Sequence, residues 1–277
     1  MHTTSPICGP MPAEEYHADH SAISNSMLKT FRQRRKIYHH QFVLGNPVVK
    51  KVTAKMDLGT LVHAALLEPE KLNTHFAVYP KSVLKSNGAL GTNASDKFEA
   101  ENAGRICLKE EAFEAAEKMV AAVRDQISQW LNAFAMIEHA IFWTDPITGL
   151  RCKCRPDFLV ISEHIKLCID IKSTGDASPE EFEKIIANLG YWMQDSHYCE
   201  GIEAKFGGEA EFILVAVENE WPHECAIHRI DPINREQGRE KRWEALAGIA
   251  ECHQTGDWRE PWTKDINEIS MKPWSIK

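Results

Sequence analysis

The sequence has no long apolar run and no sign of an export signal. No stretch approaches the ~20 apolar residues that span a bilayer, and the first residues, MHTTSPICGP, lack the charged and apolar regions of a signal peptide. We therefore expect a cytoplasmic protein with no membrane partner. Internal repeats are also absent from the sequence. Hydrophobic residues make up 43% of the 277 positions, which is enough for a sizeable core.

The sequence also lacks paired cysteines and an excess of positive charge. None of its eight cysteines forms a C-x-x-C pair, and the closest two are Cys152 and Cys154. Cysteine-based zinc and iron–sulfur sites normally need tighter pairs, so we interpret these residues as buried, reduced thiols. The net charge of −8 argues against a protein that coats nucleic acid by bulk charge. It still allows an enzyme that grips DNA through a local basic surface.

The strongest chemical signal lies in residues 151–174, which read as two strands joined by a turn at residues 162–164. Pro156-Asp157 belongs to the first strand, and Asp170-Ile171-Lys172 ends the second. Because side chains alternate along a strand, Asp170 and Lys172 share one face. We expect Asp157, on the neighbouring strand, to lie close to both of them.

Two carboxylates and one ammonium in this arrangement suit a metal-dependent hydrolase. Hard divalent cations such as Mg²⁺ prefer carboxylate oxygens and water, and a lysine beside the metal can orient or deprotonate the attacking water. It can also stabilise negative charge on a phosphate. A D-x-K pattern alone more often marks an ion pair on a solvated hairpin. The Pro-Asp pair one hairpin earlier, with aliphatic residues around both acids, favours the metal site.

Two further segments carry candidate site residues. Residues 56–69 have the apolar spacing of a helix that Pro69 ends, and His63 lies within it. A histidine at such a position is more often a core residue than a ligand. Gly59, one turn earlier, allows either backbone or DNA to approach the helix closely. On a later helix, Gln194 and Tyr198 share a face, which alone would indicate only a solvated pair.

A helix that follows Ser24 or Ser26 as N-cap, and runs to about Val43, is the most basic segment of the chain. It has two interpretations: a solvated outer face, or a surface that contacts DNA phosphates. We favour the second. Hydroxyls just beyond Lys172 could also bind backbone phosphates. The predicted DNA contacts are Lys29, Arg32, Arg34, Arg35, Ser173 and Thr174.

The remaining pattern predicts a single α/β domain over residues 1–277, with a central mixed β-sheet flanked by helices. Residues 1–22 are expected to be irregular apart from a helical turn at 11–17, and 80–104 to form a disordered or flexible loop. Glu138 could point into the site, but an exposed strand-end acid is the preferred interpretation. The tryptophans of the 258–277 tail are expected to cap the core or to meet a neighbouring subunit. Expected strands are 75–80, 138–145, 150–161, 165–172, 211–218 and 227–230, and the second, third and fourth of these are expected to form a meander. Expected helices are 108–130, 178–207 and 231–254.

In their order and spacing, His63, Pro156-Asp157, Asp170-Ile171-Lys172 and Gln194…Tyr198 resemble the motifs of RecE-type (exonuclease VIII-like) exodeoxyribonucleases of the PD-(D/E)xK nuclease superfamily. The resemblance runs from about Ile23 to the end of the chain. It implies a restriction-endonuclease-like core that binds Mg²⁺, with Mn²⁺ as a substitute. The implied ligands are His63, Asp157, Asp170 and the Ile171 carbonyl. Lys172 is the implied catalytic lysine, and Gln194 and Tyr198 border the site.

The same resemblance implies an exonuclease that degrades one strand of linear duplex DNA from its 5′ end. The 3′ overhang would serve recombination, as in phages and prophages. A ring-shaped homotetramer and a single-strand annealing protein as partner are further implications. Two alternatives remain: an endonuclease on the same core, and a DNA-end-binding scaffold with a vestigial metal site. The intact Asp–Asp–Lys set favours an enzyme.

Overall fold

The computed structural model describes residues 7–48, 53–131 and 135–271, and its core is a mixed five-stranded sheet in the order β10-β9-β8-β7-β4. The long strand β8 runs parallel to β9 and antiparallel to β7. The expected mixed sheet is therefore confirmed, and the strand carrying Asp170 lies at its centre. The strands are β4 (Ala135–Ile137), β7 (Phe158–Ile161), β8 (Lys166–Thr174), β9 (Glu211–Glu218) and β10 (Cys225–His228).

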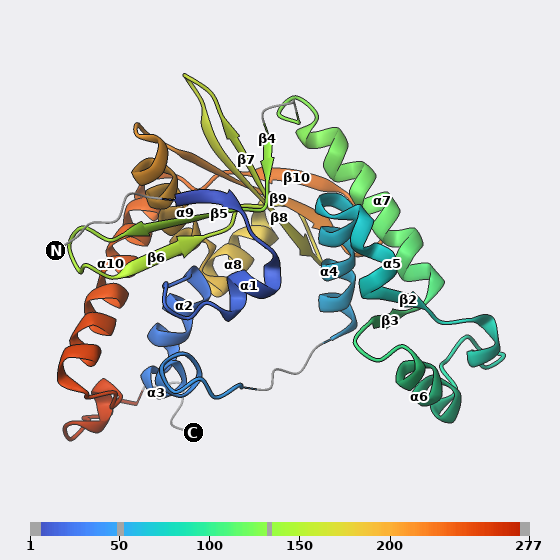
Figure 1. The fold of residues 1–277 in the computed structure, drawn as a ribbon, viewed down its shortest axis with the longest axis horizontal. Helices are drawn as coiled ribbons and strands as arrows, with labels where there is room; N and C mark the ends of the chain where they lie inside the picture. The colour runs from blue at the N-terminus through green and yellow to red at the C-terminus, as the bar shows by residue number, and fades with distance from the viewer. Residues whose placement is uncertain (1–6, 49–52, 132–134, 272–277) are drawn as a thin grey trace.

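Helices cover both faces of this sheet (Figure 1). Ile169 and Ile171 of β8 join a core with α4 and α7, whereas the alternate residue Cys168 joins a second core with α9 and α10. Buried strands with apolar residues on both faces are typical of a sheet between two helical layers. The helices are α4 (Ala54–Leu67), α7 (Glu110–Ile127), α9 (Tyr191–Phe206) and α10 (Pro232–Thr255).

A second sheet corrects the predicted meander. Residues 150–161 are not one strand, because β6 pairs with β5 while β7 pairs with β8 in the central sheet. The division falls at Arg155-Pro156-Asp157, where the proline has no N–H to continue a ladder. The N-terminal segment was expected to be irregular apart from a helical turn at 11–17; α1 agrees with that turn, but β1 is an additional strand that pairs with β5. The elements are α1 (Ala13–Ala18), β1 (Ile7–Pro10), β5 (His139–Thr144) and β6 (Arg151–Cys154).

Two helices expected to be continuous are divided. The basic helix consists of α2 (Asn25–Gln33) and α3 (Arg35–Tyr38), followed by a π-helical turn at His39–Val43. Arg34 between them is extended, and the buried carboxylate of Glu260 accepts the backbone N–H of Arg35 at 3.2 Å, which caps α3. The later helix divides at Gly190, whose left-handed backbone (φ 66°) ends α8 (Pro179–Leu189) and begins α9.

The region expected to be a flexible loop contains regular structure. After β2 (Phe76–Val78) come a 3₁₀ turn (Lys81–Val83) and helix α6 (Thr92–Glu101), and β3 (Ile106–Leu108) returns parallel to β2. The hydroxyl of Tyr79 donates to Glu99 Oε1 at 2.5 Å, so α6 is held to the end of β2. Three short helical segments complete the described chain: Pro69–Lys71, α5 (Leu72–His75) and Pro261–Thr263.

Cysteines and tryptophans follow the expectations in part. All eight thiols are free, and five of them are buried. Trp258 stacks on the rings of Tyr38 and His39 and so caps the core, whereas Trp262 is 47% exposed. Trp274 lies outside the described residues. No helix in the described ranges is long and apolar enough to span a membrane.

Candidate active site

The predicted site residues meet at the carboxyl end of β8, where α4 approaches from one face of the sheet and α9 from the other. Strand β8 contributes Asp170, Ile171 and Lys172. Asp157 immediately precedes β7, the antiparallel neighbour of β8. His63 comes from α4 and Gln194 from α9, so four elements build one site.

Asp157 links β8 to α4. One of its carboxylate oxygens accepts the backbone N–H of Ile171 at 2.7 Å, and the other lies 3.6 Å from His63 Nδ1. The residue is only 8% exposed. Burial disfavours its ionised form, but His63, Lys172 and the Ile171 N–H together favour it and lower the pKa of Asp157. The carboxylate is therefore held ionised and oriented before any ligand binds.

His63 faces the site and is not a core residue. Its Nε2 lies 3.1 Å from the Ile171 carbonyl oxygen, while its helix packs Leu61 and Val62 into the core. Burial opposes the imidazolium, yet Asp157 raises the pKa of His63 above its ordinary value. Gly59 explains how α4 comes so close: a Cβ there would lie 2.7 Å from Ser173 Oγ. The predicted close approach is thus made by the end of β8.

Asp170 is held from both sides. Its Oδ1 accepts a hydrogen bond from Gln194 Nε2 at 2.7 Å, and its Oδ2 forms a close ion pair with Lys172. Asp170 is 3% exposed, and burial raises its pKa. Burial likewise disfavours the Lys172 ammonium, but Asp170 and the neighbouring groups Tyr191 and Asp157 together raise the pKa of Lys172. Without a metal, Lys172 is therefore a fixed positive charge at neutral pH.

These donors suit a divalent metal ion in their chemistry. Two carboxylates, an imidazole and the Ile171 carbonyl converge, and hard cations favour such oxygen-rich sets. The Oδ2 atom of Asp170 is buried and, in the described structure, has only the Lys172 ammonium beside it. Within the described ranges, no three His, Cys, Asp or Glu side chains already form a metal-binding geometry. His63, Asp157, Asp170 and the Ile171 carbonyl are the groups that would hold a divalent cation here.

Tyr198, predicted to border the site, and Ser173 and Thr174, predicted to contact DNA, differ in their surroundings. The ring of Tyr198 packs edge-on against Phe212, with centroids 5.9 Å apart, and burial raises its pKa well above the ordinary value. Ser173 is half-buried against α4. Thr174 is buried, and its hydroxyl donates to the Asp176 carbonyl at 3.0 Å to close the turn after β8.

The predicted DNA contacts of the basic helix divide into two groups. Lys29 and Arg32 face the start of α9: Lys29 Nζ lies 5.7 Å from the ring centroid of Tyr191, and Arg32 Cζ lies 5.3 Å from that of Trp192. Arg34 and Arg35 instead stack on other rings, those of Trp262 and Phe31 at 5.6 and 5.2 Å. Lys29 shares the Tyr191 ring with Lys172 of the site, and Arg32 lies beside the next residue of α9, whereas Arg34 and Arg35 follow the break in the basic helix.

Glu138 is not the exposed strand-end acid that the sequence favoured. Its side chain is 17% exposed and forms a close ion pair with Arg155. Its backbone has a left-handed φ of 50°, and its N–H donates to the Asp157 carbonyl at 3.2 Å. Strained backbone is retained where surrounding contacts enforce it. In the sequence, the one hint of this ion pair was Arg155, two positions before Asp157.

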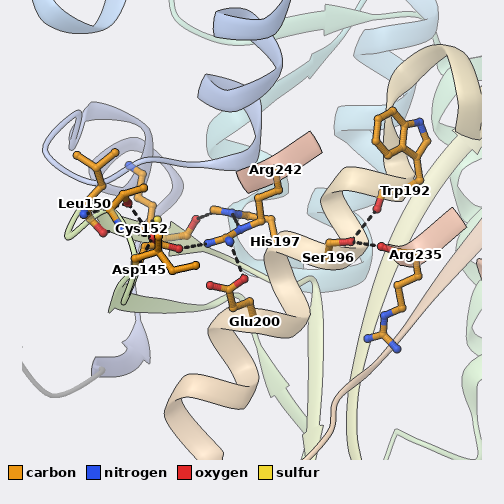
Figure 2. A network of polar contacts seen from close by, with 12 residues as sticks. Asp145, Leu150, Cys152, Trp192, Ser196, His197, Glu200, Arg235 and Arg242 are labelled. Carbon is orange, nitrogen blue, oxygen red and sulfur yellow. Dashed lines mark hydrogen bonds and ion pairs between the residues drawn. The ribbon is translucent and has the colours of Figure 1, made fainter. Parts of the chain in front are cut away.

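A buried polar network connects α9 with α10 (Figure 2). Arg242 of α10 is 3% exposed and contacts Asp145, His197 and Glu200, the last at 2.5 Å. Burial, together with Arg242, lowers the pKa of His197 to about 3, so its ring is neutral and can accept the Arg242 N–H. A charge buried this deeply requires such partners. The network ties α9 and α10 to the turn after β5.

Comparison with known proteins agrees with this geometry. Residues 24–262 match the family described as a PDDEXK-like domain of unknown function (DUF3799). Among curated proteins, none matches the chain. A crystal structure from Eubacterium rectale, of a protein provisionally named an exonuclease, has a TM-score of 0.60 at 13% identity and covers 97% of this chain and 98% of its own.

Two other solved structures are less similar in fold. SSO0001 has a TM-score of 0.31 at 15% identity, covering 75% of this chain and 89% of its own. VC1899 from Vibrio cholerae has a TM-score of 0.25 at 10% identity, covering 86% and 61%. The family match spans most of the chain and includes every residue of the site described above. The chain therefore belongs to the family of PDDEXK-like domains and has the PD-(D/E)xK nuclease fold.

Proposed function

We propose that this protein is a Mg²⁺-dependent exodeoxyribonuclease that degrades one strand of linear duplex DNA in the 5′-to-3′ direction. The observation that carries the proposal is the single cluster formed by His63, Asp157, Asp170, Lys172 and Gln194 at one strand end. A solvated hairpin pair would not bring residues from α4, β8 and α9 to one point. Among possible nuclease activities, the provisional name of the Eubacterium rectale protein favours an exonuclease over an endonuclease.

The side chains divide the work of phosphodiester hydrolysis. A bound Mg²⁺ would lower the pKa of a water ligand and neutralise charge on the phosphate. Asp157 and Asp170, with His63 and the Ile171 carbonyl, are the residues that would hold it. Gln194 fixes the orientation of Asp170 through its 2.7 Å hydrogen bond.

Lys172 supplies positive charge in this scheme. Its raised pKa means that the metal-free protein keeps it as an ammonium, which can orient the attacking water and stabilise charge on the phosphate. An arginine would not substitute, because its planar guanidinium group cannot occupy the place of a compact ammonium. Lys29 and Arg32 lie on the side of the site where the backbone phosphates of DNA could be bound.

The biological setting follows from the motif resemblance and belongs to the same proposal. A 3′ overhang is a substrate for recombination, and a single-strand annealing protein would bind the exposed strand. A ring-shaped homotetramer would enclose the duplex, and Mn²⁺ would support the reaction in place of Mg²⁺.

The test compares linear and covalently closed circular duplex DNA, with the linear substrate labelled at either its 5′ or its 3′ end. We expect Mg²⁺-dependent release of acid-soluble nucleotides from linear DNA alone, with the 5′ label released first. Early release of the 3′ label would reverse the polarity, and cleavage of the circle would indicate an endonuclease. DNA-end binding without any hydrolysis in Mg²⁺ or Mn²⁺ would indicate a vestigial site.

A further inference from the structure

The first turn of α9 brings an aromatic ring against the proposed catalytic lysine. Lys172 Nζ lies 4.8 Å from the ring centroid of Tyr191. Gln194, one turn further along the same helix, binds the carboxylate that pairs with Lys172. Helix α9 thus contacts both members of the Asp170–Lys172 pair, one through an amide and the other through a ring.

Tyr191 also contacts the basic helix. Lys29 Nζ of α2 lies 5.7 Å from the same ring centroid. Two cations next to one ring repel each other, and the electron-rich ring offsets part of that repulsion. The ring is half-buried and packs against the core that contains Phe182, so its position does not depend on the cations.

The geometry points to Tyr191 as a positioning residue, whose ring holds the Lys172 ammonium beside Asp170 and next to Lys29 of the basic helix. This inference rests on the proposed nuclease function and adds a residue to its site. Lys172 has four rotatable side-chain bonds, and Asp170 alone would restrain only its end. The Tyr191 ring is held by the core, so contact with it restricts the ammonium to one position. Even a small displacement of a catalytic group lowers the reaction rate.

Substitution separates the ring from the hydroxyl. Tyr191→Phe keeps the ring and should keep near wild-type turnover, as should Tyr191→Trp, whose face also attracts cations. Tyr191→Leu keeps apolar volume but removes the ring, and we expect kcat to fall about tenfold at saturating DNA. DNA affinity in Ca²⁺, where hydrolysis is not expected, should change little. Rescue by both aromatic variants would show that the ring, and not the hydroxyl, is required; unchanged DNA affinity in Ca²⁺ and the lysine signal described below separate this role from simple packing.

The neighbouring tryptophan provides a matched control. Trp192 occupies the same turn, but its ring faces Arg32 instead of Lys172. Trp192→Leu should therefore leave kcat at saturating DNA close to that of the wild type. An equal loss of kcat in the two leucine variants would show that α9 had been disturbed as a whole and would overturn the specific role of Tyr191.

A second measurement does not depend on activity. In ¹³C-lysine-labelled protein, ring current should shift the ε-CH₂ protons of Lys172 upfield, and the signal is assigned by its loss in Lys172→Gln. The shift should persist in Tyr191→Phe and vanish in Tyr191→Leu. Absence of the shift in the wild type, or unchanged kcat in Tyr191→Leu, would overturn the inference. If the wild type shows the shift but hydrolyses no DNA, the proposed function fails while the contact stands.

Discussion

Gln194 and Lys172 hold the two oxygens of Asp170, so its carboxylate is fixed in place. Asp170→Asn keeps the shape but removes the charge that a metal would need. We expect Mg²⁺-dependent hydrolysis to fall by more than the ~10–100-fold typical of changes around a metal site. Nucleotide release from linear duplex measures the loss, and circular dichroism checks the fold.

Asp176→Asn is a suitable control for that experiment. Asp176 lies on the exposed turn just after β8, where its carboxylate caps the backbone N–H of Ser178 at 2.8 Å. Its replacement should leave hydrolysis nearly unchanged. Near wild-type turnover in Asp170→Asn would show that the catalytic centre has been assigned to the wrong residues.

The contact between His63 and Asp157 predicts a pH-dependent stability in the metal-free protein. Because the pKa of His63 is raised, its stabilisation is complete below the ordinary value of about 6.5 and is lost as pH rises through the raised value. The lowered pKa of Asp157 keeps the carboxylate ionised until strongly acid pH. In EDTA, His63→Ala should therefore cost more at about pH 5.5 than at about pH 8.5.

Urea unfolding at the two pH values measures this difference, which solvent screening should keep to roughly 1 kcal/mol or less. His164→Ala, at an exposed turn, serves as the control and should show no such difference. An equal cost for His63→Ala at both pH values would mean that the imidazole does not pair with Asp157 in solution.

The close approach of α9 and α10 predicts a strong effect at one glycine. A Cβ on Gly238 would lie 2.3 Å from the Trp192 carbonyl oxygen and 2.4 Å from Ser196 Oγ. Figure 2 shows Ser196 bridging the carbonyls of Trp192 and Arg235. Gly238→Ala should lower the free energy of unfolding by about 1–3 kcal/mol, because the backbone must move.

The same substitution should reduce turnover, since α9 carries Gln194 and Tyr191 to the site. Gly9→Ala is the matched control, because a Cβ there meets nothing within 4 Å. Thermal unfolding and nucleotide release, measured on both variants, test the two effects together. A Gly238→Ala protein as stable as the control would mean that the two helices are further apart than described.

The division of the basic helix at Arg34 predicts unequal roles for its arginines. Arg32 lies next to the first turn of α9, whereas Arg34 stacks on Trp262 of the C-terminal segment. Arg32→Gln should weaken DNA binding and reduce the log–log salt slope by about 0.9, the value for one phosphate contact. Arg34→Gln should leave the slope unchanged. Binding in Ca²⁺ at several salt concentrations measures both, and identical slopes for the two variants would contradict this division.

The whole molecule presents an apolar C-terminal segment that the described residues do not cover. Ile266, Ile269 and Met271 are 100%, 82% and 61% exposed. Apolar residues gathered in this way often mark a protein interface. If the proposed homotetramer forms through this segment, Ile266→Asp combined with Ile269→Asp should shift the protein to smaller species in sedimentation velocity.

The paired control changes an exposed isoleucine elsewhere, Ile147→Asp, which is 71% exposed in the turn after β5. It should leave the sedimentation profile unchanged. A wild-type protein that sediments as a monomer would rule out the tetramer. Dissociation by both substitutions alike would show that the C-terminal segment has no special part in assembly.

The sequence by itself determined the elements whose signals are local. Alternating residues around Asp170-Ile171-Lys172 predicted the central strand, apolar spacing around His63 predicted α4, and the order of the motifs indicated the PD-(D/E)xK fold. The strand and the helix could be predicted because periodicity is visible over a few residues, and the fold because the motifs keep their order along the chain. The same local reading failed where the chain pairs with distant segments.

Only the tertiary structure decided which partners meet. Strand β6 turns away from β7 because it pairs with β5, and α3 begins anew because Glu260, 225 residues away, caps it. The motif resemblance indicated that Gln194 borders the site, but its hydrogen bond to Asp170 and the contact of Tyr191 with Lys172 come from the packing of α9 against β8. The stability of such long-range contacts depends on which surfaces the packed core brings together, and the arrangement of the site residues depends on these contacts.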